Sequence, residues 1–400
     1  MRVLRALTRD TPISTLHNSI TSASVSSIFP PRSRSYASRS FLCASSPALL
    51  SPRSASSSAL ASRVVGSPAA SSVSSAPFTR SPVPARSLSR STMSSAPSPS
   101  PATPVHDMAA KGFNVANDLY DRARPSYQPS VLSWIRKTAR KVDGGEKLNV
   151  LEVGAGTGIF TRALLAHPEW KDDVGELRAI EPAEGMRDQF IKSTVSTVNN
   201  NNPKITVHDG HFSSLPVPDG WADLIVIAQA FHWCPDHPAA ITEFARALKK
   251  GAPLVLVWNL EDRDAVPWIA QLRDRIERHE QGAPQFRLGL WRAFAGTKEW
   301  QTLFTEKPSP SAALPDTDTD SLPHTTSHTI SFILPGTTEL TVDRACSKSY
   351  IASLPEDERA EVVKDVRAIL EKGEGRKWID EAKGVFEYPY KATVVVGWKA

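Results

Sequence analysis

The chain has 400 residues and a formal net charge of +5 at pH 7, but this charge is unevenly divided. Residues 1–105 carry eleven arginines, no lysine and a single acid, whereas the remainder carries 36 basic against 41 acidic residues. The negative balance of the remainder removes the case for nucleic-acid binding. Three scattered cysteines (Cys43, Cys234 and Cys346) form neither a disulfide framework nor a metal site, and no ligand cluster predicts a metal. No apolar run is long enough to predict an integral membrane segment.

The first 105 residues are dominated by Ser, Ala, Pro and Arg. Such a composition buries too little apolar surface to offset the loss of chain entropy, so we expect a disordered leader at 1–105 and a folded domain at 111–400. An Arg-rich, Ser-rich and acid-poor leader is typical of a transit peptide, and residues 34–38 (RSYAS) resemble a matrix-processing site. We therefore expect import into the mitochondrion. The alternative is a cytoplasmic protein whose translation starts at Met93 or Met108.

The folded part opens with a helical pattern in which Phe113 and Tyr120 share one face. The pattern breaks at Arg124, which precedes a proline, and a second helix is predicted over 129–141 because Pro129 suits a first helical turn. By spacing alone this segment reads as an amphipathic helix docked on a sheet, with the Arg124 guanidinium in solvent.

The clearest stretch is 148–161, which reads LNVLEVGAGTGIFT. An apolar run of strand length leads into glycines at alternate positions and then into a helix predicted over 159–166, a geometry that brings backbone amides close to a ligand. The stretch has the form E-x-G-x-G-x-G, made by Glu152, Gly154, Gly156 and Gly158. A dinucleotide fingerprint would place its third glycine where Ile159 stands, and a P-loop would need a lysine that is absent.

Three further strands are predicted, and each ends on residues able to serve a site. The strand at 177–180 ends on Glu181, and an acid at that place grips ribose hydroxyls in nucleotide-binding α/β folds. The strand at 205–208 leads to His211 and Phe212. The strand at 222–230 is apolar enough to be buried on both faces, and it leads to the aromatic segment 231–233. Because ligands of parallel sheets bind beyond the carboxyl ends of the strands, these loops should meet at one site.

The remaining predicted elements complete an α/β pattern of alternating strands and helices. They are helices at 184–198, 238–250, 266–279 and 354–371, and strands at 254–258, 325–334 and 386–398. A Pro/Ser/Asp/Thr-rich loop is expected at 305–320.

This succession resembles the class I S-adenosylmethionine-dependent methyltransferases, in particular the small-molecule branch of methyltransferase type 11 with its UbiE-like and trans-aconitate-methyltransferase-like members. The resemblance covers residues 113–399. It implies a Rossmann-like, seven-stranded, mostly parallel sheet with helices on both faces and an antiparallel last strand between the fifth and sixth. It also implies S-adenosyl-L-methionine as the cofactor, a small-molecule methyl acceptor and a helical insertion at 344–354 over the substrate.

The resemblance also assigns the cofactor-binding residues. They are Glu152, Gly154, Gly156, Gly158, Glu181, His211, Phe212, Tyr120 and Arg124. Tyr120 and Arg124 would close over the amino-acid end of the cofactor. The family usually carries an acid and a small residue near the adenine, where this chain has His211 and Phe212; Asp209 is an alternative partner for the adenine.

His232 is the candidate catalytic residue, because a histidine with a pKa near 6.5 can take a proton from an acceptor at neutral pH. The alternative is a wall residue of the pocket with no proton role. Phe231, Trp233 and Tyr350 are the candidate acceptor-pocket residues, and simple packing is the alternative for the aromatics.

The predicted function is transfer of a methyl group to oxygen or carbon of a small molecule by in-line displacement. The acceptor alternatives are a quinone-type ring carbon and a carboxyl group of the aconitate type. A catalytically silent accessory protein of the same fold is the non-enzyme alternative, disfavoured by the intact glycines and Glu181. An NAD-dependent oxidoreductase is disfavoured by Ile159.

Overall fold

A computed structural model describes residues 117–141, 145–197, 203–307 and 322–400. The leader predicted at 1–105, the alternative starts Met93 and Met108, Phe113, and most of the loop predicted at 305–320 lie outside these residues. Within the described ranges, no helix has the length and apolar character needed to cross a membrane.

The described strands form one sheet in the order β3-β2-β1-β4-β5-β9-β6, with β7 and β8 also paired to β9. The strands are β1 (Leu148–Val153), β2 (Val174–Ile180), β3 (Lys204–His208), β4 (Leu224–Ala228), β5 (Pro253–Glu261), β6 (Phe304–Thr305), β7 (Thr326–Gly336), β8 (Trp378–Asp380) and β9 (Val385–Lys399). Strands β1 to β5 are parallel to one another.

The last strand, β9, runs antiparallel between β5 and β7. Val394 shows this directly, because it pairs with Val257 of β5 on one side and with His328 of β7 on the other. The predicted fold class is therefore confirmed, including the antiparallel last strand. The two short strands β6 and β8 are additions that carry too few residues to give a recognisable sequence pattern.

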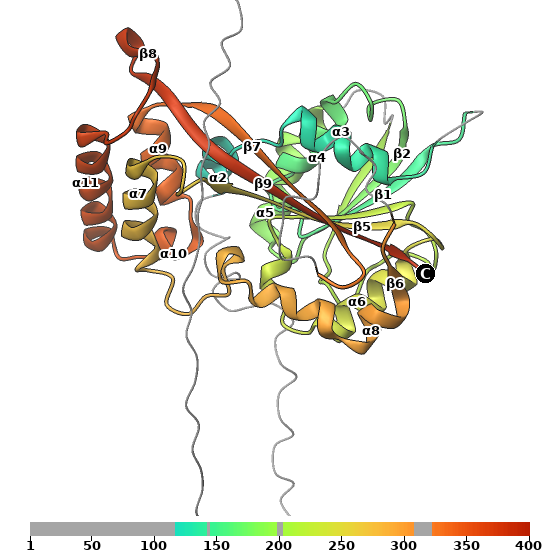
Figure 1. Cartoon of the computed structure of the whole chain (residues 1–400). Helices are drawn as coiled ribbons and strands as arrows, with labels where there is room; N and C mark the ends of the chain where they lie inside the picture. The colour runs from blue at the N-terminus through green and yellow to red at the C-terminus, as the bar shows by residue number, and fades with distance from the viewer. Residues whose placement is uncertain (1–116, 142–144, 198–202, 308–321) are drawn as a thin grey trace, which may run out of the picture. The chain divides into compact units, whose positions relative to one another are not determined.

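The helices connect the strands and cover both faces of the sheet (Figure 1). They are α2 (Asn117–Ala123), α3 (Pro129–Thr138), α4 (Ile159–Ala166), α5 (Glu184–Ser193), α6 (His237–Ala247), α7 (Pro267–Glu277), α8 (Lys298–Leu303), α9 (Thr338–Cys346), α10 (Ser349–Ala352) and α11 (Glu356–Lys372). Short 3₁₀ turns are η1 (Val195–Thr197), η3 (Phe231–Trp233), η4 (Phe286–Leu288), η5 (Leu290–Gly296) and η6 (Glu381–Lys383).

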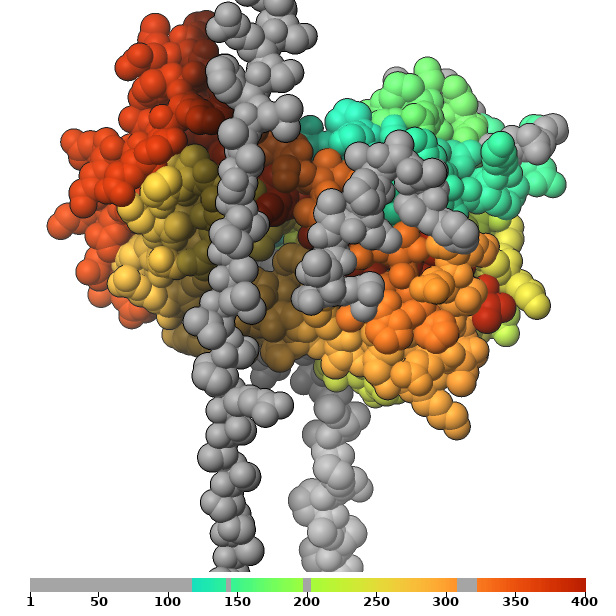
Figure 2. Space-filling view, viewed as in Figure 1, coloured from blue at the N-terminus to red at the C-terminus, as the bar shows by residue number. Residues whose placement is uncertain are grey.

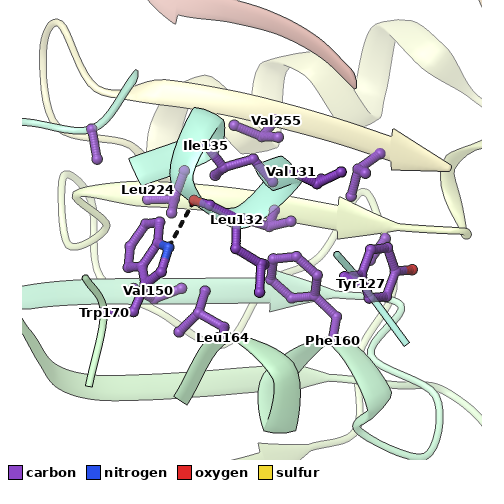
Figure 3. Close-up of a cluster of buried hydrophobic side chains, with 14 of the residues drawn as sticks. Tyr127, Val131, Leu132, Ile135, Val150, Phe160, Leu164, Trp170, Leu224 and Val255 are labelled. Carbon is purple, nitrogen blue, oxygen red and sulfur yellow. Dashed lines mark hydrogen bonds between the residues drawn. The ribbon is translucent and has the colours of Figure 1, made fainter. Parts of the chain in front are cut away.

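Helices α3 and α4 pack on one face of the sheet and α6, η5 and α8 on the other. Side chains alternate along a strand, so Leu224 of β4 joins the first layer and Ile225 the second. In the first layer the Trp170 indole N–H donates to the Leu132 carbonyl oxygen at 2.9 Å, which ties the chain after α4 to α3 (Figure 3). The central strands are apolar on both faces, as a parallel sheet between helix layers requires.

A third apolar cluster lies around the long β7–β9 pair, beyond the main helix layers. It joins α7, α9, α10 and α11 to β9 through residues such as Trp268, Val342, Ile351, Val362 and Tyr388. Helices α7 and α11 pack side by side, and their gold and red surfaces adjoin in Figure 2. Helices α9 and α10 are the observed form of the insertion predicted at 344–354.

Candidate functional site

The glycine loop follows β1 and is held by backbone hydrogen bonds. The amides of Gly154 and Ala155 donate to the Ile180 carbonyl oxygen at 2.8 and 3.1 Å, which fixes the loop against the end of β2. Gly154, Gly156 and Gly158 have φ angles of +72°, +56° and +86°, a region in which a side chain is strained. The sequence E-x-G-x-G-x-G thus produces the sharp turn that it predicts.

The three glycines serve different purposes. A Cβ atom at Gly154 would lie 2.5 Å from Ala230 Cβ, and one at Gly158 would lie 2.5 Å from Thr194 Oγ1. A Cβ atom at Gly156 would have no neighbour within 4 Å, and Gly156 lines a cavity. Gly154 and Gly158 therefore allow close packing of the chain, whereas Gly156 keeps backbone open to the cavity.

This first cavity has a volume of about 360 Å³ and lies beyond the carboxyl ends of β1, β2 and β4. Most of the predicted cofactor residues line it, together with one predicted acceptor residue: Tyr120, Arg124, Glu152, Gly154, Gly156, Glu181, His211, Phe212 and Trp233. Gly158, also predicted as a cofactor residue, is not among the residues that line this cavity. Its conformation instead starts α4, of which it is the N-cap.

Glu181 lies at the end of β2 and is only 6% exposed. One carboxylate oxygen accepts from the Gly156 amide and the other from the Ala183 amide, both at 2.9 Å. Burial raises the pKa of Glu181 despite these two hydrogen bonds. Each oxygen keeps a further lone pair, so the carboxylate can still accept from a ligand hydroxyl while it orients the glycine loop.

Glu152, at the end of β1, is the second buried acid of the first cavity. The Thr161 hydroxyl of α4 donates to its carboxylate. Burial raises the pKa of Glu152 to about 8, and the Thr161 hydrogen bond and Arg162 only partly oppose this shift. Glu152 is therefore a site at which a positively charged ligand group would stabilise the ionised form.

His211 and Phe212 both line the first cavity from the loop after β3. Ring nitrogen Nδ1 of His211 lies 3.1 Å from the Ser213 hydroxyl, and Phe212 meets Phe231 edge to face at 6.0 Å. Asp209 does not line the cavity, and its carboxylate is ion-paired with Arg187 at 3.2 Å.

A second, smaller cavity adjoins the first and shares four lining residues with it: Tyr120, Arg124, Gln229 and Trp233. The predicted residues His232 and Tyr350 line the second cavity only. Tyr350 comes from α10, so the insertion does bring a side chain to this cavity. Trp258 and Trp291 line neither cavity and stack in the core, with ring centroids 4.4 Å apart.

His232 has a different chemistry from the one predicted. The Trp258 indole N–H donates to His232 Nδ1 at 3.2 Å, so the remaining hydrogen of the neutral ring is on Nε2. Burial, aided by the charge of Arg124, lowers the pKa of His232 to about 3 rather than the expected 6.5. Its only lone pair is therefore occupied, and the geometry fits a wall residue of the cavity better than a general base.

Phe231 lines neither cavity, which agrees with the packing alternative stated for the aromatic residues. Its side chain is fully buried and meets Phe294 edge to face at 5.5 Å and Phe212 at 6.0 Å. The 3₁₀ turn at 231–233 points Phe231 into the core while His232 and Trp233 line a cavity.

Several residues that line the second cavity were not predicted from the sequence. Gln229 directly follows β4 with a φ of +58°, and its side-chain amide donates to the Asn259 carbonyl oxygen at 2.6 Å. A polar residue closing an apolar strand is a signal that could have revealed Gln229. Lys348 and Gln285 give no such signal, because only the tertiary fold brings them to the cavity.

No group of three or more His, Cys, Asp or Glu side chains within the described ranges is arranged to hold a metal ion. The acids of the first cavity instead face the glycine loop and the helix that follows it.

Residues 151–256 match the Methyltransferase domain family. The chain is 34% identical over 173 residues to an uncharacterized methyltransferase-like protein of Schizosaccharomyces pombe, over 43% of this chain and 60% of that protein. It is 30% identical over 203 residues to an uncharacterized methyltransferase of Mycobacterium tuberculosis, over 50% of this chain and 73% of that protein. The YcgJ protein of Bacillus subtilis matches in structure with 19% identity and a TM-score of 0.40, over 68% of this chain and 99% of that protein.

The match to the S. pombe relative spans less than two thirds of that relative's length. The match to the M. tuberculosis relative spans more than two thirds of that relative's length. The glycine loop, the acid after β2 and strands β2, β3 and β4 lie within the matched segment. The chain belongs to the class I S-adenosylmethionine-dependent methyltransferase family.

Proposed function

We propose that this protein is an enzyme that transfers a methyl group from S-adenosyl-L-methionine to oxygen or carbon of a small-molecule acceptor. The observation that carries the proposal is the backbone at Gly156. It is open to the first cavity, and its amide donates a hydrogen bond to the buried Glu181 carboxylate. When bound, S-adenosylmethionine supplies a methyl group already activated by the sulfonium charge, so alignment with the acceptor is the main requirement.

The residues of the first cavity fit the parts of this cofactor. Glu181 has free lone pairs for ribose hydroxyls, and Phe212 offers an aromatic wall for the adenine. Tyr120 and Arg124 lie where the first cavity meets the second, with the guanidinium 4.8 Å from the Tyr120 ring. The acceptor would bind in the second cavity, because this cavity shares a wall with the first.

Calorimetric titration of the full chain tests the cofactor assignment. We expect binding of S-adenosylmethionine and of its product S-adenosylhomocysteine, and no binding of NADH. Binding of NADH instead would favour an oxidoreductase, and binding of neither would favour an accessory protein. Incubation with a labelled methyl donor and a metabolite extract would then reveal the acceptor.

We also propose import into the mitochondrion, on the composition of residues 1–105 alone. Expression of the full chain with a C-terminal tag should give a shortened protein in the mitochondrial fraction. An uncleaved cytoplasmic protein would favour translation from Met93 or Met108.

A further inference from the structure

The short helix α2 lies where the two cavities meet. Tyr120 of α2 lines both cavities, and so does Arg124, which directly follows the helix. The Arg124 amide donates to the Tyr120 carbonyl oxygen at 3.1 Å, so Arg124 continues the last helical turn. The contacts that fix α2 therefore also fix the two side chains that the cavities share.

Apolar packing contributes little to the placement of α2. Only Ala123 among its seven residues is buried. A helix of seven residues is not stable by itself in water, so the surrounding structure must hold it. It contacts both α5 and α9 (Figure 1). With so little buried apolar surface, the polar contacts of α2 decide where it lies.

Asp121 fastens α2 to the glycine loop. The hydroxyl of Thr157, which stands between Gly156 and Gly158, donates to Asp121 Oδ1 at 2.6 Å. The Arg162 guanidinium of α4 donates to the same oxygen at 2.5 Å and to the Thr157 carbonyl oxygen at 2.7 Å. The three residues thus form a closed network. Because Thr157 lines the first cavity, this network joins α2 to the wall of that cavity.

The end of α2 is attached to a different part of the chain. Arg344 of α9 donates from Nε to the Ala123 carbonyl oxygen at 2.9 Å. The Arg124 guanidinium donates to the Ser347 carbonyl oxygen, just after α9, at 3.0 Å. These two hydrogen bonds locate the end of the helix beside the insertion, and Asp121 attaches the same helix to the cofactor side.

Asp121 itself lines neither cavity, so it is not placed to contact a ligand in either one. Its ion pair with Arg162 is partly exposed, with side-chain exposures of 18% for Asp121 and 30% for Arg162. Ion pairs that water reaches contribute little to stability. The network is therefore better suited to fixing a position than to stabilising the fold.

We propose that Asp121 is a positioning residue, which holds Tyr120 and Arg124 against the cofactor by fastening α2 to the glycine loop. The inference rests on the proposed function for the identity of the ligand, but the attachment of α2 can be measured without a ligand. A ligand that meets a wall already in place does not have to order it on binding, which improves its affinity.

Hydrogen exchange of the full chain, measured by mass spectrometry without ligand, tests the attachment. Asp121→Ala removes both hydrogen bonds, and peptides covering 117–124 should exchange about ten- to 100-fold faster, the scale of a hydrogen bond to a charged group. Asp121→Asn keeps an oxygen for Thr157 and Arg162 and should stay within about threefold of the parent. Asp118→Ala is the matched control, because it removes an exposed carboxylate of the same helix that pairs with the exposed Arg122. Unchanged exchange in Asp121→Ala would overturn the inference.

Calorimetric titration with S-adenosylhomocysteine tests the positioning. Asp121→Ala should raise the Kd by about ten- to 100-fold, whereas Asp121→Asn and Asp118→Ala should stay within about threefold of the parent. The same substitution is then made in a chain that carries Tyr120→Ala and Arg124→Ala. There Asp121→Ala should change the Kd by less than about threefold, because the side chains through which it acts are gone. A merely structural role would instead give the full effect in both backgrounds.

The outcomes separate this inference from the proposed function. A parent chain that does not bind S-adenosylhomocysteine would refute the proposed function. If the parent binds it, then parent-like affinity in Asp121→Ala, or a full effect in the Tyr120→Ala and Arg124→Ala background, would refute the role of Asp121 alone.

Discussion

Replacing Gly156 by alanine should separate ligand binding from folding. The φ of +56° makes alanine about 1–2 kcal/mol less favourable than glycine, and no neighbour within 4 Å adds a clash. The new methyl group would extend into open space at a residue that lines the first cavity. Filling a fitted site in this way costs about 1–3 kcal/mol, so the Kd for S-adenosylhomocysteine should rise by about five- to 150-fold.

Gly158→Ala should show the opposite pattern. Its Cβ atom would lie 2.5 Å from Thr194 Oγ1 and 2.8 Å from the Phe190 ring, at a φ of +86°. Strain and overlap together should lower the free energy of unfolding by about 2–4 kcal/mol. Gly158 does not line the cavity, so the protein that remains folded should bind S-adenosylhomocysteine with nearly the parent affinity.

Denaturant unfolding and calorimetric titration on the same preparations distinguish the two variants. Gly384→Ala is the matched control, because Gly384 has a φ of +66° and no neighbour within 4 Å but lines neither cavity. It should lose about the same stability as Gly156→Ala and keep full affinity. Parent-like affinity in Gly156→Ala would refute the assignment of the glycine loop to the cofactor.

Three further predictions concern ionisable residues. Glu181→Ala should weaken S-adenosylmethionine binding, measured by calorimetry, by about 1.5–3 kcal/mol. Glu181→Gln should weaken it by less, because glutamine keeps one oxygen acceptor. Parent-like binding by both variants would place the ribose elsewhere. His232→Gln should raise the KM of an identified acceptor and leave kcat within about tenfold, whereas a loss of about 10²–10⁴ in kcat would restore the general-base role. Burial raises the pKa of Glu152 from 4.5 to about 8, so between these pH values the folded chain binds a proton that the unfolded chain has lost. Glu152 should therefore lower the free energy of unfolding by about 1.4 kcal/mol for each pH unit of rise through that window. Glu152→Gln should remove this slope when the free energy of unfolding is measured by denaturant titration at several pH values. An unchanged slope would contradict the raised pKa.

The cofactor side of the site could be predicted because local sequence determines it. Each residue follows a strand directly, and parallel strands bring their carboxyl ends to one edge of the sheet. Glu152, Gly156 and Glu181 therefore reach the first cavity whatever the rest of the chain does. The separate purposes of Gly156 and Gly158 could not be predicted, since only the fold shows which glycine faces Thr194 and which faces open space.

The acceptor side could not be predicted in the same way. Arg124, Gln285 and Lys348 come from three segments far apart in the chain and share no spacing that a sequence pattern could reveal. Neighbouring residues also diverge, because the turn after β4 buries Phe231 in the core and leaves His232 at the cavity. Aromatic character alone gave no means of telling a core residue from a wall residue.

The hydrogen bond from Trp258 to His232 bears on the acceptor class as well. With Nδ1 accepting from the indole, Nε2 carries a hydrogen, so the histidine can only donate to a ligand. Lys348 and Arg124 also line the second cavity, and His232, its one lining histidine among the described residues, has no free basic ring nitrogen. A neutral hydroxyl acceptor would need a base to remove its proton, whereas a carboxylate at neutral pH has already lost its own. The hydrogen bond that occupies Nδ1 of His232 therefore favours an acceptor that needs no proton removed by this residue.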